Sequence, residues 1–137
     1  MSMNVNNMLK RQHRHPAHIL VVEDDSEMRA LLVDELTDAG YRVCPAGDGA
    51  EAADRLAEEV FDLIITDMKM PRMDGFDLLA ILTERGLSLP VIAISAFFEE
   101  GPGADVLRAR TLTCLSKPLR MDELKSVVKT ALHPPKR

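Results

Sequence analysis

The sequence predicts an α/β protein: a single domain built on a doubly wound, parallel five-stranded sheet with (βα)5 connectivity. Three features of the 137-residue chain lead to this prediction. Short, continuous apolar runs recur along the chain, as expected for strands that are buried on both faces. Segments with apolar residues at helical spacing lie between these runs. Strands that alternate with helices favour a parallel sheet with helices on both faces.

The predicted strands are apolar runs bounded by polar residues, glycine or proline. In chain order they are HILVV (18–22), YRVCPA (41–46), FDLIITD (61–67), LPVIAIS (89–95) and LTCLS (112–116). The second run contains Pro45, which lacks the N–H that a sheet ladder requires and is tolerated at a sheet edge. We therefore expect the second strand to lie at an edge of the sheet.

The predicted helices have recognisable starts and ends. Side chains that can cap a helix precede three of them, at Ser26, Asp48 (in a capping-box pattern with Glu51) and Asp74. The expected ends lie near Gly40, Glu59, Gly86 and Pro134, and a short helix is expected at 104–110. The last helix has an apolar face at i, i+3, i+4, i+7 and i+8, formed by Leu124, Val127, Val128, Ala131 and Leu132.

Polar side chains lie at the ends of four of the five strands, as the last residue of the strand or directly after it. They are Glu23-Asp24-Asp25, Asp67, Ser95 and Lys117. Ligand sites of parallel sheets lie beyond the carboxyl ends of the strands, so these residues should meet in one cleft. Carboxylates that lie this close repel one another unless a cation joins them, and a few carboxylates with a carbonyl suit Mg²⁺. The set predicts a metal site that can bind a phosphoryl group on a carboxylate.

Some of these acids also have simpler explanations. Asp25 and Glu27 suit the first turn of a helix, where negative charge is favoured by the helix dipole. Asp74, directly before Gly75, is expected to be a helix cap and not a ligand. The joint occurrence of an acid, a hydroxyl and an ammonium at the ends of neighbouring strands is what indicates a site.

Charge is unevenly distributed along the chain. The net charge is −5, yet residues 1–16 contain Lys10, Arg11 and Arg14 and no acid, so the remaining chain is more acidic still. We expect a flexible basic tail at 1–16, one domain at 17–132 and a short C-terminal tail at 133–137. An acidic domain repels the phosphate backbone, so direct nucleic-acid binding is not expected.

The cysteines and apolar stretches favour a cytoplasmic protein without a membrane partner. Cys44 and Cys114 form no close-spaced motif and lie in strand-like segments, as expected for reduced core thiols. The longest apolar stretch, LPVIAISAFF, is too short to cross a bilayer. The N-terminal residues lack the apolar core of a signal peptide.

Four stretches of the chain resemble the receiver domain of bacterial two-component response regulators. They are ILVVEDDSEMR, FDLIITDMKMPRMDG, VIAISA and LSKPL, and the resemblance covers about residues 17–132. It implies a flavodoxin-like strand order of 2-1-3-4-5. It also implies a phosphoprotein of phosphorelay signal transduction, either a stand-alone receiver or part of a longer protein. The implied partners are a histidine kinase or phosphotransfer protein, an output protein, and a second copy of the chain after phosphorylation.

The resemblance assigns roles to individual residues. Asp67 would be the phosphoacceptor, and Asp24 and Asp67 would bind Mg²⁺, or Mn²⁺ in its place, together with the backbone carbonyl of Lys69. Glu23 would act on the metal through water. Ser95 and Lys117 would contact the phosphoryl group, whose oxygens would also accept from the backbone amides of Met68 and Ala96. The Lys117-Pro118 bond would be cis. Lys69 and Phe97 would flank the phosphoryl group and slow its hydrolysis.

Three departures from the family pattern concern the signalling face. Cys114 occupies the position of the family's aromatic switch residue. Arg110-Thr111 stands in place of a common Gly-Ala pair, and Gly101-Pro102-Gly103 falls where the fourth helix usually begins. We therefore expect intact phosphorylation chemistry and a different rearrangement on phosphorylation.

Two other functions are compatible with parts of the pattern. A magnesium-dependent phosphatase that forms an aspartyl phosphate would carry its nucleophile in Asp-x-Asp after the first strand, where this chain has Glu23-Asp24-Asp25. A receiver-like binding module that needs no phosphorylation would not require the acids, Ser95 and Lys117. We therefore expect a signalling module and not an enzyme. The only reactions that we expect of it are its own phosphorylation and dephosphorylation.

Overall fold

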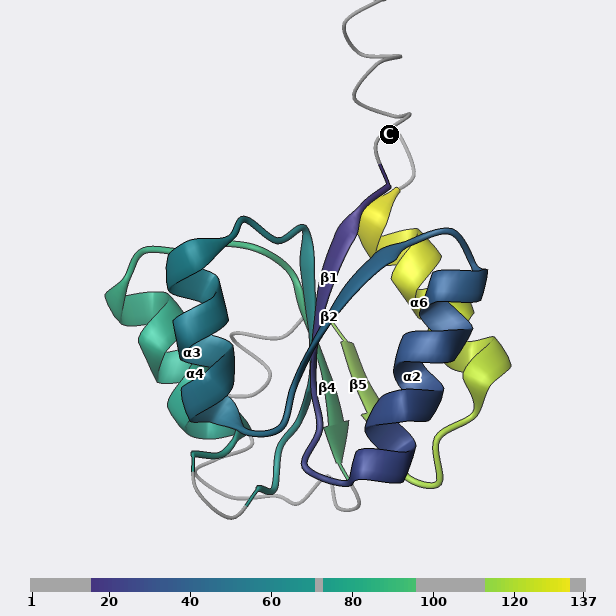
Figure 1. The fold of residues 1–137 in the computed structure, drawn as a ribbon, viewed down its shortest axis with the longest axis horizontal. Coiled ribbons are helices and arrows are strands. Elements are labelled where there is room, and N and C mark those ends of the chain that lie inside the picture. Colours follow the sequence, from purple (N-terminus) through teal and green to yellow (C-terminus); the bar gives the residue numbers. More distant parts are fainter. Residues whose placement is uncertain (1–15, 71–72, 96–112, 134–137) are drawn as a thin grey trace, which may run out of the picture.

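The computed structural model describes residues 16–70, 73–95 and 113–133 (Figure 1). Within them, five strands form one parallel sheet in the order β2-β1-β3-β4-β5. The strands are β1 (His18–Val22), β2 (Arg42–Ala46), β3 (Leu63–Asp67), β4 (Val91–Ser95) and β5 (Thr113–Ser116). The predicted fold class is confirmed, as are the strand order and the edge position of β2, which contains Pro45.

Helices cover both faces of the sheet. The described helices are α2 (Ser26–Asp38), α3 (Gly49–Glu58), α4 (Gly75–Glu84) and α6 (Met121–Leu132). Figure 1 shows α3 and α4 on one face and α2 and α6 on the other. The helix predicted at 104–110 lies outside the described residues.

Two apolar cores separate these layers because successive strand residues face opposite sides of the sheet. Leu20 of β1 packs in the core that contains Leu78 of α4. Its neighbour Ile19 packs in the core that contains Leu32 of α2 and Leu124 of α6. All five side chains are fully buried, and burial of each contributes about 1.5–3 kcal/mol to the free energy of folding. This two-sided burial explains why the strands read as continuous apolar runs.

The N-cap of α2 is Asp25, so the prediction that Ser26 caps this helix was wrong. The Asp25 carboxylate accepts hydrogen bonds from the backbone N–H groups of Glu27 and Met28, at 2.9 and 3.0 Å. Asp25 has an extended backbone, whereas Ser26 is already helical. An ionised carboxylate that reaches two free N–H groups is a stronger acceptor than a hydroxyl.

The other predicted caps lie where the sequence placed them. Asp48 accepts from the Glu51 N–H at 2.8 Å, while the Glu51 carboxylate accepts from the Gly47 N–H at 3.3 Å. Asp74 forms a reciprocal capping box with Asp77, so its interpretation as a cap is confirmed. At the opposite ends of α2 and α4, Gly40 and Gly86 adopt φ values of +102° and +69°, which glycine tolerates best.

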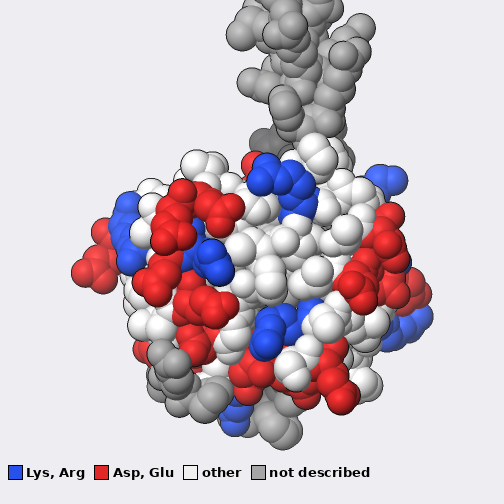
Figure 2. Space-filling model, viewed as in Figure 1, with Lys and Arg blue, Asp and Glu red and all other residues white. Residues whose placement is uncertain are grey.

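The surface of the described part is rich in acidic side chains. In Figure 2 they gather over α3, which contains Glu51, Asp54 and Glu58, and over α2, which contains Asp34, Glu35 and Asp38. Such faces do not attract a phosphate backbone. Among the described residues, no helix is both long enough and apolar enough to span a membrane.

Cys44 and Cys114 form no disulfide in the described part of the chain, and each is only half-buried. Burial raises the pKa of the Cys44 thiol, and the neighbouring Glu59 carboxylate adds to the effect. Cys44 is therefore held in its neutral, less reactive form.

Candidate functional site

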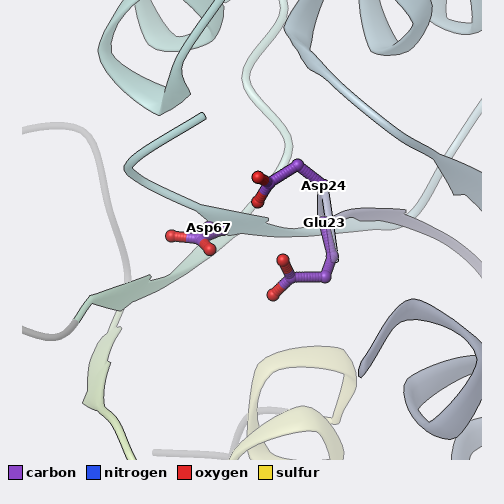
Figure 3. A group of neighbouring side chains, drawn as sticks. All are labelled: Glu23, Asp24 and Asp67. Carbon is purple, nitrogen blue, oxygen red and sulfur yellow. The ribbon is translucent and has the colours of Figure 1, made fainter. Parts of the chain in front are cut away.

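The carboxylates of Glu23, Asp24 and Asp67 form a cluster at the carboxyl edge of the sheet. One oxygen of each lies within 4.8 Å of the others (Figure 3). The pairing of β1 with β3 brings Val22 opposite Thr66, so Glu23, which follows β1, lies beside Asp67, the last residue of β3. The structure thus joins two segments that lie more than forty positions apart in the sequence, as the strand-end pattern predicted.

Lys117 supplies a positive charge to this cluster from the end of β5. Its Nζ lies 2.7 Å from Asp67 Oδ2 and 4.0 Å from Glu23 Oε1. Its backbone N–H donates to the carbonyl of Ser95 at 2.9 Å, and the Lys117-Pro118 peptide bond is cis, as the resemblance implied. Burial alone would lower the pKa of Lys117, but the hydrogen bond and charge of Asp67, with the nearby acids, outweigh it and raise the pKa.

Glu23 is almost completely buried, with 2% of its surface exposed. Burial is the main reason why the pKa of Glu23 is raised from 4.5 to about 7. The negative charge of Asp67 raises it further, whereas the hydrogen bond from the Asp25 N–H and the charge of Lys117 act in the opposite direction. The cluster therefore holds a carboxyl group that a bound cation would ionise.

Both oxygens of the Asp67 carboxylate accept hydrogen bonds. Oδ2 accepts from Lys117, and Oδ1 accepts from the backbone N–H of Lys69 at 3.1 Å. The Met68 N–H, expected to hold a phosphoryl oxygen, donates instead to the carbonyl of Ile94 at 3.1 Å and continues the pairing of β3 with β4. Lys69 therefore provides the backbone donor that faces the carboxylate in this structure.

The remaining predicted site residues lie on β4, on β5 and beyond the described segments. Ser95 is buried at the end of β4 and pairs with Ser116 of β5. Cys114 pairs with Ala93 and packs against the core beneath α3 and α4. Ala96 and Phe97 lie outside the described residues, as do Gly101-Pro102-Gly103 and Arg110-Thr111.

The cluster fits a magnesium ion. Magnesium binds a few carboxylate and carbonyl oxygens at about 2.1 Å and usually keeps several waters. One oxygen each of Glu23, Asp24 and Asp67 lies within 4.8 Å of the others, so these acids are close enough to share one cation, directly or through water. Three acids with one ammonium also leave negative charge for a divalent cation to neutralise. With Mg²⁺ bound there, Asp24, Asp67 and the Lys69 carbonyl are the expected direct ligands.

Two features near the cluster were not predicted from the sequence. Arg29 of α2 donates to the backbone carbonyls of Glu23 and Asp24, at 2.7 and 3.4 Å. Gly49, the first residue of α3, donates its N–H to the Met73 carbonyl at 2.9 Å and thereby holds the loop after β3. Main-chain partners of this kind leave no periodic signal in a sequence, so neither contact could have been found from it.

A parallel sheet in this order, with a lysine and an acidic cluster that could hold a metal ion at its carboxyl edge, defines a flavodoxin-like α/β domain. The sequence model described as "Response regulator receiver domain" matches residues 19–129, and the chain belongs to that family.

The curated relatives include a receiver protein of similar length and sensor kinases that are much longer than this chain. The chain is 39% identical over 114 residues to the response regulator receiver protein CpdR of Brucella abortus, an alignment that covers 83% of this chain and 95% of CpdR. It is 36% identical over 110 residues to the sensor histidine kinase RcsC of Salmonella typhi, covering 80% of this chain but only 12% of RcsC.

Solved receiver structures share the fold. The receiver domain of the Francisella response regulator 1452 has a TM-score of 0.79 and 29% identity, and the match covers 88% of this chain and 99% of that one. The Thermotoga maritima response regulator TrrA, in complex with Mg(2+)-BeF, has a TM-score of 0.74 and 28% identity, covering 85% of this chain and 99% of that one.

Proposed function

We propose that the chain is a phosphoacceptor signalling module in which Asp67 takes a phosphoryl group from a phosphohistidine with the help of Mg²⁺. The donor would be a histidine kinase or a histidine phosphotransfer protein, and phosphorylation would change the binding of an output protein. The observation that carries the proposal is the position of the Lys117 ammonium, 2.7 Å from Asp67 Oδ2 beside the carboxylates of Glu23 and Asp24.

The reaction forms one bond and breaks another. A carboxylate oxygen of Asp67 attacks phosphorus as the bond between phosphorus and the donor imidazole nitrogen breaks. The imidazole leaves with the bonding electron pair and takes up a proton. Bound Mg²⁺ supplies charge neutralisation to the phosphoryl oxygens and the acids. Lys117 contributes a fixed positive charge beside Asp67, and the Ser95 hydroxyl contributes a hydrogen-bond donor.

The acyl phosphate would later be lost to water, so the module resets itself and is not an enzyme with an external substrate. By the family resemblance, Lys69 and Phe97 would flank the phosphoryl group, where an ammonium and a ring would slow hydrolysis by stabilising charge and excluding water. The similar response regulator TrrA is described as a complex with Mg(2+)-BeF, which supports the proposal for this chain. A cytoplasmic location and a dimer that forms on phosphorylation belong to the same proposal.

Intact-mass measurement after incubation with acetyl phosphate and Mg²⁺ tests the proposed function. The wild-type protein is expected to gain the mass of one PO₃H, and the adduct should persist and be labile to base. Asp67→Asn should gain nothing, because an amide is not a competent nucleophile. Continuous release of phosphate without an adduct would instead indicate a phosphatase, and no reaction at all would indicate a binding module that is independent of phosphorylation.

A matched control separates the chemistry from folding. Asp74→Asn changes a nearby aspartate whose side chain caps α4 and can be replaced there by an equally good capping residue. This variant should be phosphorylated like the wild type. If it lost phosphorylation together with Asp67→Asn, the loop as a whole and not the Asp67 carboxylate would account for the effect.

A further inference from the structure

The segment that carries Glu23 and Asp24 has left the sheet when it reaches the acidic cluster. Strand β1 ends at Val22. The last sheet-like hydrogen bond of the segment runs from the Glu23 N–H to the Ala46 carbonyl, at 3.0 Å. The next two carbonyls, those of Glu23 and Asp24, no longer have a neighbouring strand to pair with. The Glu23 carbonyl is partly buried and therefore needs another donor, whereas the Asp24 carbonyl is exposed.

Arg29 provides that donor from the first turns of α2. One guanidinium nitrogen, Nη1, lies 2.7 Å from the Glu23 carbonyl and 3.4 Å from the Asp24 carbonyl. The same nitrogen lies against Gly47, since a Cβ atom added to that glycine would be 3.5 Å from it. The guanidinium is therefore enclosed between the end of β1 and the loop that follows β2.

The main chain at Glu23 is thus held from three directions. Its N–H is bound to β2 at Ala46, its carbonyl is bound to Arg29, and its side-chain Oε2 accepts from the Asp25 N–H at 3.0 Å. Asp25 is in turn fixed as the N-cap of α2. Of these contacts, only the one from Arg29 includes a fixed positive charge and reaches two successive peptide groups, which makes it the strongest single constraint on the segment.

We propose that Arg29 is a positioning residue for the cation site: it holds the backbone of Glu23 and Asp24 so that their carboxylates lie where Mg²⁺ can join them to Asp67. Arg29 acts through main-chain oxygens and needs no contact with the metal or the phosphoryl group. Partners behind metal ligands commonly tune affinity by about tenfold or more. This inference rests on the proposed function, because it assumes that the cluster binds magnesium.

Arg29→Met tests the inference, because methionine keeps an unbranched apolar stem and removes the donors. Arg85→Met is the matched control. Arg85 also donates a guanidinium nitrogen to a main-chain carbonyl, that of Ala53, at 3.0 Å, but it lies at the end of α4, away from the acidic cluster. The magnesium dissociation constant should be measured by calorimetry for both variants and the wild type, together with the melting temperature of each.

The expected result is a dissociation constant for Mg²⁺ about tenfold higher in Arg29→Met and unchanged in Arg85→Met, although both variants lose some thermal stability. Without metal, the Asp25 amide of Arg29→Met should exchange its hydrogen faster than in the control variant, because the segment is less restrained. At saturating Mg²⁺, acetyl phosphate should still phosphorylate Arg29→Met to the wild-type extent.

Three outcomes would overturn the inference. The dissociation constant could be unchanged while the melting temperature falls, which would make Arg29 a purely structural residue. Both variants could weaken magnesium binding equally, which would indicate a global effect. Phosphorylation of Arg29→Met could fail even at saturating Mg²⁺, which would place Arg29 in the reaction and not behind the metal. Absence of magnesium binding by the wild type would be a different result, since it would remove the proposed function itself.

Discussion

The ammonium of Lys117 and the carboxylate of Asp67 lie 2.7 Å apart, although fifty positions separate them in the sequence. The contact joins the end of β5 to the end of β3 across the intervening strand β4. The carbonyl of Ser95, the last residue of β4, accepts a hydrogen bond from the Lys117 N–H. Asp67 is almost fully buried, whereas the Lys117 side chain retains access to solvent. The ammonium supplies a counter-charge to the buried carboxylate, and the same ammonium can meet an incoming phosphoryl group.

Replacement of Lys117 by methionine should slow phosphorylation without removing the metal site. Loss of one preorganised donor to a developing negative charge typically lowers a rate about 100-fold or more. Mg²⁺ affinity should be maintained or increased, because removal of the Lys117 ammonium leaves the negative charge of the three acids to be neutralised by the metal alone. The phosphorylation rate with acetyl phosphate and a calorimetric magnesium titration measure the two effects separately.

Lys125→Met is the control for Lys117→Met. Lys125 of α6 forms an ion pair with Glu35 of α2, at 2.6 Å, on the opposite side of the domain from α3 and α4. Its loss should leave both the phosphorylation rate and magnesium binding unchanged. Equal losses in the two variants would show that ion pairing in general, and not the position of Lys117, supports the reaction.

The raised pKa of Glu23 predicts how stability depends on pH in the metal-free protein. The pKa of Glu23 is about 7 in the folded protein against 4.5 for an ordinary glutamate, so the folded state binds more protons between these values. The free energy of unfolding should therefore fall as the pH rises from about 4.5 to 7, by at most roughly 3 kcal/mol from this group. Below pH 4.5 the group is protonated in both states and its effect is constant.

Glu23→Gln isolates that contribution. Glutamine keeps the size and polarity of the side chain but cannot ionise, so this variant should gain stability relative to the wild type as the pH rises through the same range. Urea unfolding in the presence of EDTA, at several pH values, measures the difference. A wild-type minus variant difference that is flat from pH 4.5 to 7 would contradict the pKa assignment. Added Mg²⁺ should reduce the difference, because the cation favours the ionised carboxylate.

Gly75 should not tolerate a larger side chain. A Cβ atom at this position would collide with Met68 Sδ and would lie 2.9 Å from the Met68 Cα, so the conflict involves the main chain that follows Asp67. Gly75→Ala is expected to lower the free energy of unfolding by about 1–3 kcal/mol and to displace the loop. Thermal or urea unfolding checks the first effect, and the extent of phosphorylation checks the second.

Phe76→Ala serves as the comparison, because Phe76 is the next residue and is one of the exposed large apolar side chains of the described chain. Its replacement should change stability by much less than Gly75→Ala. A larger loss from Phe76→Ala would mean that the start of α4 is held mainly by its exposed face and not by its close approach to Met68.

The sequence was most informative where topology alone determines position. A parallel sheet brings strand ends to one edge, so Asp24, Asp67 and Lys117 could be placed together without knowledge of any distance. It was less informative where neighbouring residues compete for the same role, as at the start of α2. Asp25 and Ser26 both carry an acceptor oxygen, and only the backbone angles decide which of them is the cap.

Contacts that involve the main chain could not be predicted. The Met68 amide pairs with Ile94, and the Arg29 guanidinium binds two carbonyls, because of exact strand lengths and loop paths that periodicity does not encode. The raised pKa of Glu23 also depends on burial that becomes visible only after the chain has folded. These local contacts determine the orientation of residues that the sequence had already placed in the site.

The identity of the phosphorylated residue is the most direct test of the central claim. The protein should be incubated with acetyl phosphate and Mg²⁺ and then treated with borohydride, which reduces an aspartyl phosphate to homoserine. Tandem mass spectrometry of the resulting peptides should locate homoserine at position 67, and omission of Mg²⁺ should greatly reduce it. Homoserine at position 24 or another aspartate, or no homoserine in a protein that remains folded, would contradict the assignment of Asp67 as the phosphoacceptor.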